Sequence, residues 1–241
     1  ERRTIIMKEI LFGAAYYLEY MPYDRLKEDL DMMQQAGMNT IRIAESTWST
    51  LEPTDGEFDF SYIDRVLEEA QKRKMNVIIG TPTYAIPSWL EKKCPEVMVY
   101  NKEGRARYGH RQIMHPVFRK YAERVICKLA EHTAAHPSVI GFQIDNETKH
   151  YGTASKEVQE LFKEHLKEKY HTTEALNKAF YLAYWSNSIH DWDDLPDMLG
   201  CINGGLATEF AAFQRSLAAQ YLQWQSDLVS KYKKKEQFIT H

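Results

Sequence analysis

Short apolar runs alternate with stretches of helical periodicity along this chain. The runs that predict strands cover residues 11–17, 40–43, 76–80, 139–144 and 237–240. Between them, apolar residues recur every three or four positions, as on the buried face of a helix, over about residues 23–36, 59–70 and 117–129. Short apolar strands are typical of a parallel sheet that helices cover on both faces. The pattern therefore predicts a β/α series.

Single residues mark several of the expected boundaries. Gly37 is expected to end the first helix, because glycine is a common helix stop. Asp59 can cap the second helix through its side-chain oxygen. Pro137 separates the third helix from the strand at residues 139–144. These signals support the division into β/α units.

Two long segments depart from this simple alternation. Residues 81–115 are expected to form a long loop rich in aromatic and basic side chains. Residues 155–235 are expected to be largely helical, with interruptions at residues 186–195 and at Gly204 and Gly205. We interpret the second segment as a helical insertion.

The length and composition predict one α/β domain. The chain has 241 residues, 44% of them hydrophobic, which is near the typical length of one (β/α)8 TIM barrel. Five expected strands do not close a barrel of eight, and an uncovered sheet edge is a liability. We therefore expect residues 1–241 to be the N-terminal portion of a single TIM-barrel domain, carrying its first four to five β/α units.

Charge and cysteine content narrow the possible partners and compartment. Lys and Arg number 31 against 34 for Asp and Glu, so no excess of positive charge favours nucleic acid or an anionic membrane. Cys94, Cys127 and Cys201 are widely spaced and odd in number, which suggests reduced thiols. Residues 1–12 are too short and too charged for a secretory signal. We expect a cytoplasmic protein that acts on a neutral substrate.

Asn146 and Glu147 directly follow the apolar run at residues 139–144. The carboxyl ends of parallel strands are where this architecture collects its chemistry. A carboxyl group in a concave, partly dry site can hold a proton at neutral pH and donate it, and Asn146 can bind a substrate hydroxyl. The alternative is that both residues merely turn the chain and cap the next helix.

Two arginines and four tryptophans are weaker candidates. Arg42 could bind sugar hydroxyls or a carboxylate from inside a barrel, or it could form a structural ion pair with Glu45. Arg111 has donors suited to bidentate contact, but it lies in a basic loop that could simply be solvated. Tryptophan rings can stack on sugars, although they are more often core residues. Those considered are Trp48, Trp89, Trp185 and Trp192.

No metal site is expected. His132 and His136 have a spacing of four on a predicted helix, but no third ligand accompanies them. Asp191, Asp193 and Asp194 lack the ligand spacing and the glycine of a calcium loop, so we interpret them as surface residues.

Several stretches, taken in order, resemble glycoside hydrolase family 42, whose members are β-galactosidases with retaining (β/α)8 barrels. The stretches that resemble the first four strand ends of that family are residues 12–17, 41–53, 81–90 and 141–147. Residues 175–186 resemble a helical insertion of the same family. The resemblance spans nearly the entire chain.

The resemblance implies roles for individual residues. Glu147 would be the acid/base, Asn146 would bind the hydroxyl next to the anomeric carbon, and Arg111 would help to hold galactose. Trp185 resembles a tryptophan near the active site that is sometimes contributed across a trimer interface. Retention requires two carboxylates about 5–5.5 Å apart and no cofactor. The nucleophilic glutamate of the family lies on the seventh strand, beyond His241.

Residues 108–116 depart from the family pattern. They lack a frequent Arg-Arg pair and the nearby cysteine of zinc-containing members, so no structural zinc is expected. The resemblance implies a β-galactoside or galacto-oligosaccharide substrate and a possible homotrimer. Two alternatives stay open: a related glycosidase for another sugar, such as a β-glucosidase or arabinosidase, and a non-catalytic carbohydrate-binding half barrel.

Overall fold

The computed structural model describes residues 9–105 and 111–241. The chain divides into two compact units. The sheet unit consists of Glu1–Pro87, Glu123–Asn146 and Gln225–His241, and the helical unit consists of Ser88–Ala122 and Glu147–Trp224.

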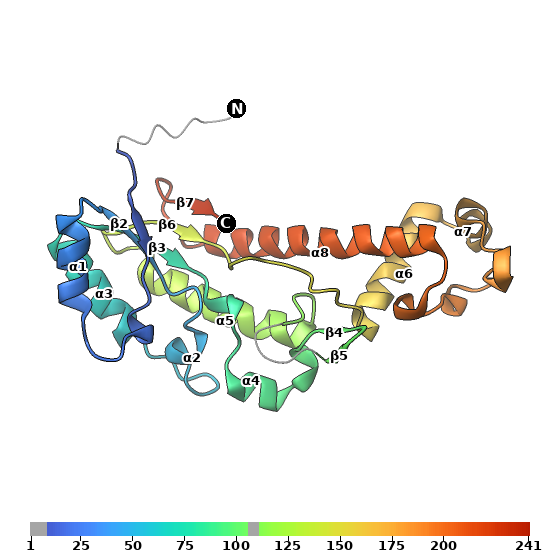
Figure 1. Cartoon of the computed structure of the whole chain (residues 1–241), viewed down its shortest axis with the longest axis horizontal. Helices are drawn as coiled ribbons and strands as arrows, with labels where there is room; N and C mark the ends of the chain where they lie inside the picture. The colour runs from blue at the N-terminus through green and yellow to red at the C-terminus, as the bar shows by residue number, and fades with distance from the viewer. Residues whose placement is uncertain (1–8, 106–110) are drawn as a thin grey trace. The chain divides into compact units, whose positions relative to one another are not determined.

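The sheet unit contains five parallel strands in the order β1-β2-β3-β6-β7 (Figure 1). Their bounds are β1 Gly13–Ala15, β2 Thr40–Ile43, β3 Asn76–Gly80, β6 Val139–Gln143 and β7 Phe238–Thr240. Each expected strand is confirmed, and β2 and β3 have the predicted bounds. The order of the strands in the sheet follows their order in the chain, as in the wall of a β/α barrel.

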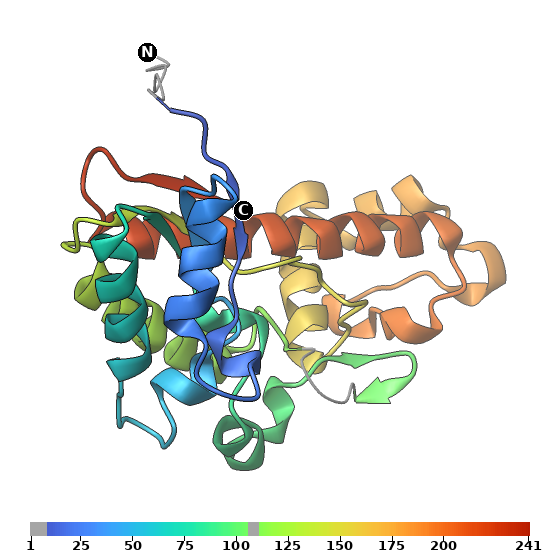
Figure 2. The same ribbon diagram turned by 60° about the vertical axis from the view of Figure 1, so that its left-hand side comes forward.

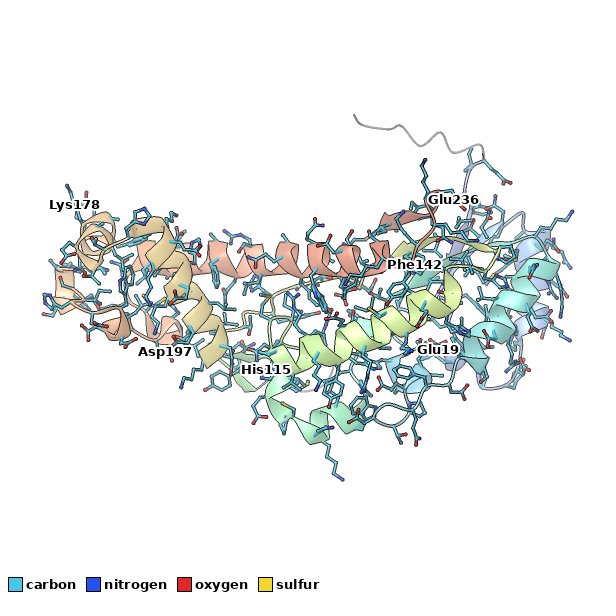
Figure 3. All side chains as sticks on the ribbon, turned by 180° about the vertical axis from the view of Figure 1, so that it is seen from behind. Glu19, His115, Phe142, Lys178, Asp197 and Glu236 are labelled. Atoms are coloured by element: carbon cyan, nitrogen blue, oxygen red, sulfur yellow. The ribbon has the colours of Figure 1, made fainter. Side chains whose placement is uncertain are left out.

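Apolar side chains of the central strands form the core of the sheet unit. Ile41 and Ile43 of β2 and Val77 and Ile79 of β3 are at most 1% exposed. Phe142 of β6, labelled in Figure 3, is also buried. Burial of one such side chain contributes about 1.5–3 kcal/mol relative to an exposed position.

Helices α1 Leu26–Gln35, α2 Trp48–Leu51 and α3 Ser61–Lys72 follow the first two strands, and α1 and α3 lie side by side (Figure 2). Gly37 confirms its predicted role, because it follows the end of α1 with a φ of 80°. Asp59 accepts a hydrogen bond from the backbone nitrogen of Ser61 at 2.9 Å. The bonds to Ser61 lower the pKa of the Asp59 carboxyl, so the charged carboxylate stays at the start of α3.

The helical unit contains α4 Ser88–Lys93, α6 Lys156–Tyr170 and α7 Thr173–Phe180, together with the antiparallel pair β4 Tyr100–Asn101 and β5 Gly104–Arg105. Helices α5 Pro116–Thr133 and α8 Gly204–Ser230 each contribute residues to both units. The 3-10 helices are η1 Leu18–Tyr20, η2 Pro82–Tyr84, η3 Pro95–Val97, η4 Tyr184–Ser186, η5 Trp192–Asp194 and η6 Met198–Gly200. Phe162 of α6 packs against Phe210 and Phe213 of α8, with ring centroids 5.0 and 5.3 Å apart.

Two predictions about the longer segments were wrong. Residues 81–115 are not one loop, since α4, β4 and β5 lie within them; each is too short for its periodicity to stand out. Gly204 and Gly205 do not interrupt a helix but begin α8. A Cβ at position 205 would lie 3.0 Å from the ring of Phe180, so the close packing of Phe180 favours glycine at this position.

Candidate active site

The carboxyl ends of the five strands lie along one edge of the sheet unit, because all the strand pairs are parallel. Polar side chains gather in the segments that follow these ends. They are Tyr16 and Tyr17 after β1, Glu45 after β2, Thr81 and Thr83 after β3, and Asp145 and Asn146 after β6. This edge is where the fold favours chemistry.

Arg42, on β2, forms an ion pair with Glu45. Its Nε lies 2.5 Å from one carboxylate oxygen and its Nη2 lies 2.7 Å from the other. The hydroxyl of Tyr17 donates to the same carboxylate. Burial, followed by this hydrogen bond, raises the pKa of Tyr17, so the hydroxyl keeps its proton. The structural ion pair that the sequence allowed is therefore present.

Gly80, the last residue of β3, makes room for this ion pair. A Cβ at Gly80 would lie 2.7 Å from the Cβ of Glu45 and 2.9 Å from its Cα. Glu45 itself is only 2% exposed and follows Ala44, whose φ is 80°. A larger residue at Gly80 would displace the backbone that carries the carboxylate.

Asp145 lies at the end of β6 in a closed ring of hydrogen bonds. Its backbone nitrogen donates to Thr81 Oγ1 at 2.6 Å, and Thr81 Oγ1 donates to Gln225 Oε1 at 2.6 Å. Gln225 Nε2 donates to Thr83 Oγ1 at 2.8 Å, and Thr83 Oγ1 donates to Asp145 Oδ1 at 2.7 Å. All four residues are at most 2% exposed.

Asn146 and Glu147 follow this ring directly. Asn146 is half-buried, and its Oδ1 accepts a hydrogen bond from Gln143 Nε2 at 3.3 Å. The side chain of Glu147 is 63% exposed, and its Oε2 lies 3.7 Å from Lys149 Nζ. The partly dry surroundings expected for Glu147 are thus not seen, because its carboxylate faces solvent and a lysine. The φ of Glu147 is 44°, which fixes an unusual chain direction.

Arg111 is fully buried in the helical unit. Its Nη1 donates to the hydroxyl of Tyr151 at 3.2 Å, and its guanidinium carbon lies 5.8 Å from the centre of the Tyr151 ring. The solvated-loop alternative for Arg111 was therefore wrong. Residues 108–110, which precede it in the predicted basic segment, lie outside the described residues.

Trp185, in η4 of the helical unit, has a side chain 69% exposed. Its ring stacks on Tyr184, with centroids 5.5 Å apart and an interplanar angle of 25°. Its φ is 55°, so the backbone holds this large ring outward in a left-handed conformation. The structure therefore presents a flat aromatic face.

The weaker sequence candidates have structural roles. Trp48 is fully buried, and its indole nitrogen donates to Glu52 at 2.9 Å. His132 Nε2 lies 2.6 Å from Asp64, and its ring stacks on Phe60. The acidic loop holds a capping box between Asp191 and Asp194, and Asp193 pairs with Lys163.

Over residues 9–105 and 111–241, no group of three or more His, Cys, Asp or Glu side chains is placed to hold a metal ion. Within those same ranges, no helix has the length and apolar content needed to cross a membrane. Cys94, Cys127 and Cys201 are free thiols.

Sequence reasoning found the strand end with Asn146 and Glu147 but missed the ring around Asp145. Thr81 and Thr83 lie in a stretch that resembles a strand end of the family, but nothing in it points to Asp145, and Gln225 lies 142 residues after Thr83 within a long helix. A polar residue on the buried face of α8 was the only signal available.

Comparison with known proteins gave a consistent result at the sequence level. The model of a family described as beta-galactosidase matches residues 15–241. Beta-galactosidase BgaA of Clostridium cellulovorans is 31% identical over 235 residues, which are 95% of this chain and 36% of that protein. Beta-galactosidase BgaA of a Thermus species is 36% identical over 192 residues, which are 77% of this chain and 30% of that protein.

Solved structures agree with the sequence comparison. The crystal structure of a beta-galactosidase from the psychrophilic Marinomonas ef1 matches with a TM-score of 0.87 and 28% identity, over 95% of this chain and 36% of that one. The chain thus spans about a third of the length of these relatives. The expected α/β class is confirmed, with five strands of a (β/α)8 barrel.

Proposed function

Because this chain belongs to glycoside hydrolase family 42, we propose that it carries part of the active site of a retaining β-galactosidase, with Glu147 as general acid/base. The observation that supports this most directly is the position of Glu147. It follows Asn146 at the carboxyl end of β6, on the sheet edge where barrel enzymes perform their chemistry.

The proposed reaction has two displacements. A nucleophilic carboxylate attacks the anomeric carbon while Glu147 gives its proton to the departing oxygen, and the glycosyl group becomes bonded to the nucleophile. Glu147, now ionised, then removes a proton from water, which attacks the same carbon and releases galactose. We assign the nucleophile to sequence outside residues 1–241, because the family carries it on the seventh strand.

The exposure of Glu147 suits both steps. Its carboxylate needs access to the glycosidic oxygen and then to water, and its side chain is 63% exposed.

Four further side chains are proposed to contact the β-galactoside. Asn146 would bind the hydroxyl next to the anomeric carbon, with its amide oriented by Gln143. Arg42 would offer the N–H groups that Glu45 does not use, since a guanidinium has five donors. Arg111, held by Tyr151, would help to bind the galactose ring.

Trp185 is the fourth side chain. We propose that its exposed ring forms an aromatic wall of the sugar site in a homotrimer, reached across a subunit interface. No cofactor is required. The free thiols support placement in the cytoplasm.

The test is replacement of Glu147 in the protein expressed from its complete gene. For Glu147→Ala we expect kcat/KM on lactose, which has a poor leaving group, to fall by about a thousandfold, in the range of general acid catalysis. Formation of the glycosyl-enzyme from dinitrophenyl galactoside should change by less than about tenfold, because that leaving group needs no proton. Azide should restore turnover of the second substrate.

Glu57→Ala is the matched control, since Glu57 is an exposed glutamate in the loop after β2. This variant should leave kcat/KM on lactose and glycosyl-enzyme formation from dinitrophenyl galactoside unchanged. Near-normal lactose turnover by Glu147→Ala would contradict the assignment of the acid/base.

A further inference from the structure

The ring of hydrogen bonds around Asp145 fixes this residue at two points. Thr81 accepts from its backbone nitrogen, and Thr83 donates to its carboxylate. Gln225 closes the ring, because its amide oxygen accepts from Thr81 and its amide nitrogen donates to Thr83. Gln225 is therefore linked by hydrogen bonds to the main chain of Asp145 through Thr81 and to its side chain through Thr83.

The direction of each bond in the ring requires a glutamine at position 225. Each threonine hydroxyl accepts one hydrogen bond and donates one, which leaves Thr81 in need of an acceptor and Thr83 in need of a donor. A glutamine offers both on one terminal group, whereas an ionised glutamate offers only acceptors and methionine offers little of either. Because Gln225 is fully buried, water does not readily replace a missing partner.

The ring holds a backbone that would otherwise relax. The φ of Asp145 is 52° and that of Glu147 is 44°, so two of three consecutive residues have left-handed conformations. Such conformations are uncommon in residues other than glycine and persist where the surroundings hold them. The direction in which the chain leaves β6 thus depends on contacts made by Asp145.

We infer that Gln225 is a positioning residue for the acid/base: through Thr81 and Thr83 it fixes the turn at Asp145 and so aims Glu147. The inference rests on the proposed role of Glu147. Gln225 touches neither substrate nor the reacting atoms in this scheme, and its effect passes through the strand end.

A purely structural role is the competing explanation, and the chain contains a matched control for it. Gln237 is 3% exposed and lies in the same unit. Its Nε2 donates to the carbonyl oxygens of Ala134 and Val139, at 2.9 and 2.8 Å. Val139 is the first residue of β6, so Gln237 supports the end of the strand that is remote from Asn146.

The experiment compares Gln225→Met with Gln237→Met in the protein expressed from its complete gene. Both remove buried hydrogen bonds and should lower the melting temperature. For Gln225→Met we expect kcat/KM on lactose to fall about ten- to hundredfold, since a displacement near 1 Å costs about a hundredfold. Glycosyl-enzyme formation from dinitrophenyl galactoside should fall less than about threefold, because it needs no acid. Gln237→Met should leave the ratio of the two rates, lactose hydrolysis to glycosyl-enzyme formation from dinitrophenyl galactoside, unchanged.

A double variant gives a second readout. If Gln225 acts only through Glu147, then Gln225→Met should cost nothing further on lactose once Glu147→Ala is present. Gln237→Met should have the same small effect in both backgrounds. If Gln225→Met prevents folding, Thr83→Val takes its place, with Thr83→Ser as the conservative variant that should restore wild-type behaviour.

The outcomes separate this inference from the proposed function. The positioning role would be overturned if Gln225→Met slowed the reactions of both substrates equally, or if its effect on lactose turnover added to that of Glu147→Ala. Either result would leave Glu147 as acid/base. If Glu147→Ala itself shows no dependence on the leaving group, both the proposed function and this inference fail.

Discussion

Individual charges in the sheet unit hold backbone segments in place. Glu52 is fully buried and accepts hydrogen bonds from Trp48 and from the backbone of Gly56, and it pairs with Arg124. Glu69 plays a similar part on α3, where it pairs with Lys72 and with Arg73, each at 2.7 Å. The ion pairs of Glu69 contribute to stability only while its carboxylate is ionised.

Glu69 should make stability depend on pH. Hydrogen bonds from Lys72 and Arg73 lower the pKa of Glu69 from its ordinary value of 4.5 to about 2. The stabilisation is therefore complete above about pH 4.5 and is lost as the pH falls towards 2. We expect Glu69→Gln to cost about 1 kcal/mol at pH 7, since the partners are partly exposed, and much less near pH 2.

Urea unfolding at several pH values measures this difference. Glu68→Gln, at the exposed neighbouring position on α3, is the control and should show a smaller change. A loss for Glu69→Gln that stays constant from pH 7 to pH 2 would be inconsistent with the ion pairs as its cause.

Site prediction from sequence depended on how far apart the contacting residues lie. The strand end that carries Asn146 and Glu147 was predicted because the strand before them is a clear apolar run. Arg42 and Glu45 are three residues apart, so their ion pair was also foreseeable. The partners of Asp145 come from α8 and from the segment after β3, and no local pattern joins them.

At the scale of elements, strands were predicted better than short helices. Strand β3 contains a continuous apolar run, Val77 to Ile79, and β2 consists of β-branched residues apart from Arg42, so their bounds could be read directly. Helix α4 has only six residues, fewer than two full turns, which is too few for periodicity to identify. Glycine was an ambiguous signal for helix boundaries. Gly37 follows the end of α1, whereas Gly204 is the first residue of α8.

Two glycine substitutions should separate backbone effects from packing effects. An added Cβ meets nothing within 4 Å at either Gly37 or Gly204, but only Gly37 has a positive φ, of 80°. We expect Gly37→Ala to destabilise the protein by about 1 kcal/mol and Gly204→Ala to be neutral or stabilising by a few tenths.

Thermal unfolding of both variants provides the measurement. A similar effect at the two positions would show that the left-handed conformation does not set the end of α1. Because neither substitution creates a clash, overpacking is not an explanation for any loss at Gly37.

For the molecule as a whole, the described part supplies five strands of the eight in a barrel, and with them Glu147, which we propose as one of the two carboxylates that retention needs. Residues 1–241 cover about a third of the length of their relatives. The proposed activity therefore belongs to the protein that the complete gene encodes.

Nitrophenyl glycosides test the sugar specificity of that protein. We expect the β-galactoside to be hydrolysed at least about tenfold faster, as kcat/KM, than the β-glucoside, which differs in the direction of one hydroxyl. Residues 1–241 expressed alone should hydrolyse neither. Preference for the glucoside or the arabinoside would assign the protein to another sugar, and turnover by residues 1–241 alone would show that the nucleophile lies within them.

The ring at Asp145 also has a consequence for biosynthesis. Thr83 and Gln225 are 142 residues apart, and a ribosome adds about 5–20 residues each second, so roughly 7–30 s pass between them. During that interval β3 and β6 can already pair, while the turn that carries Asn146 and Glu147 lacks its last tie. The nascent chain can therefore pair β3 with β6 before Gln225 is available to fix the turn at Asp145.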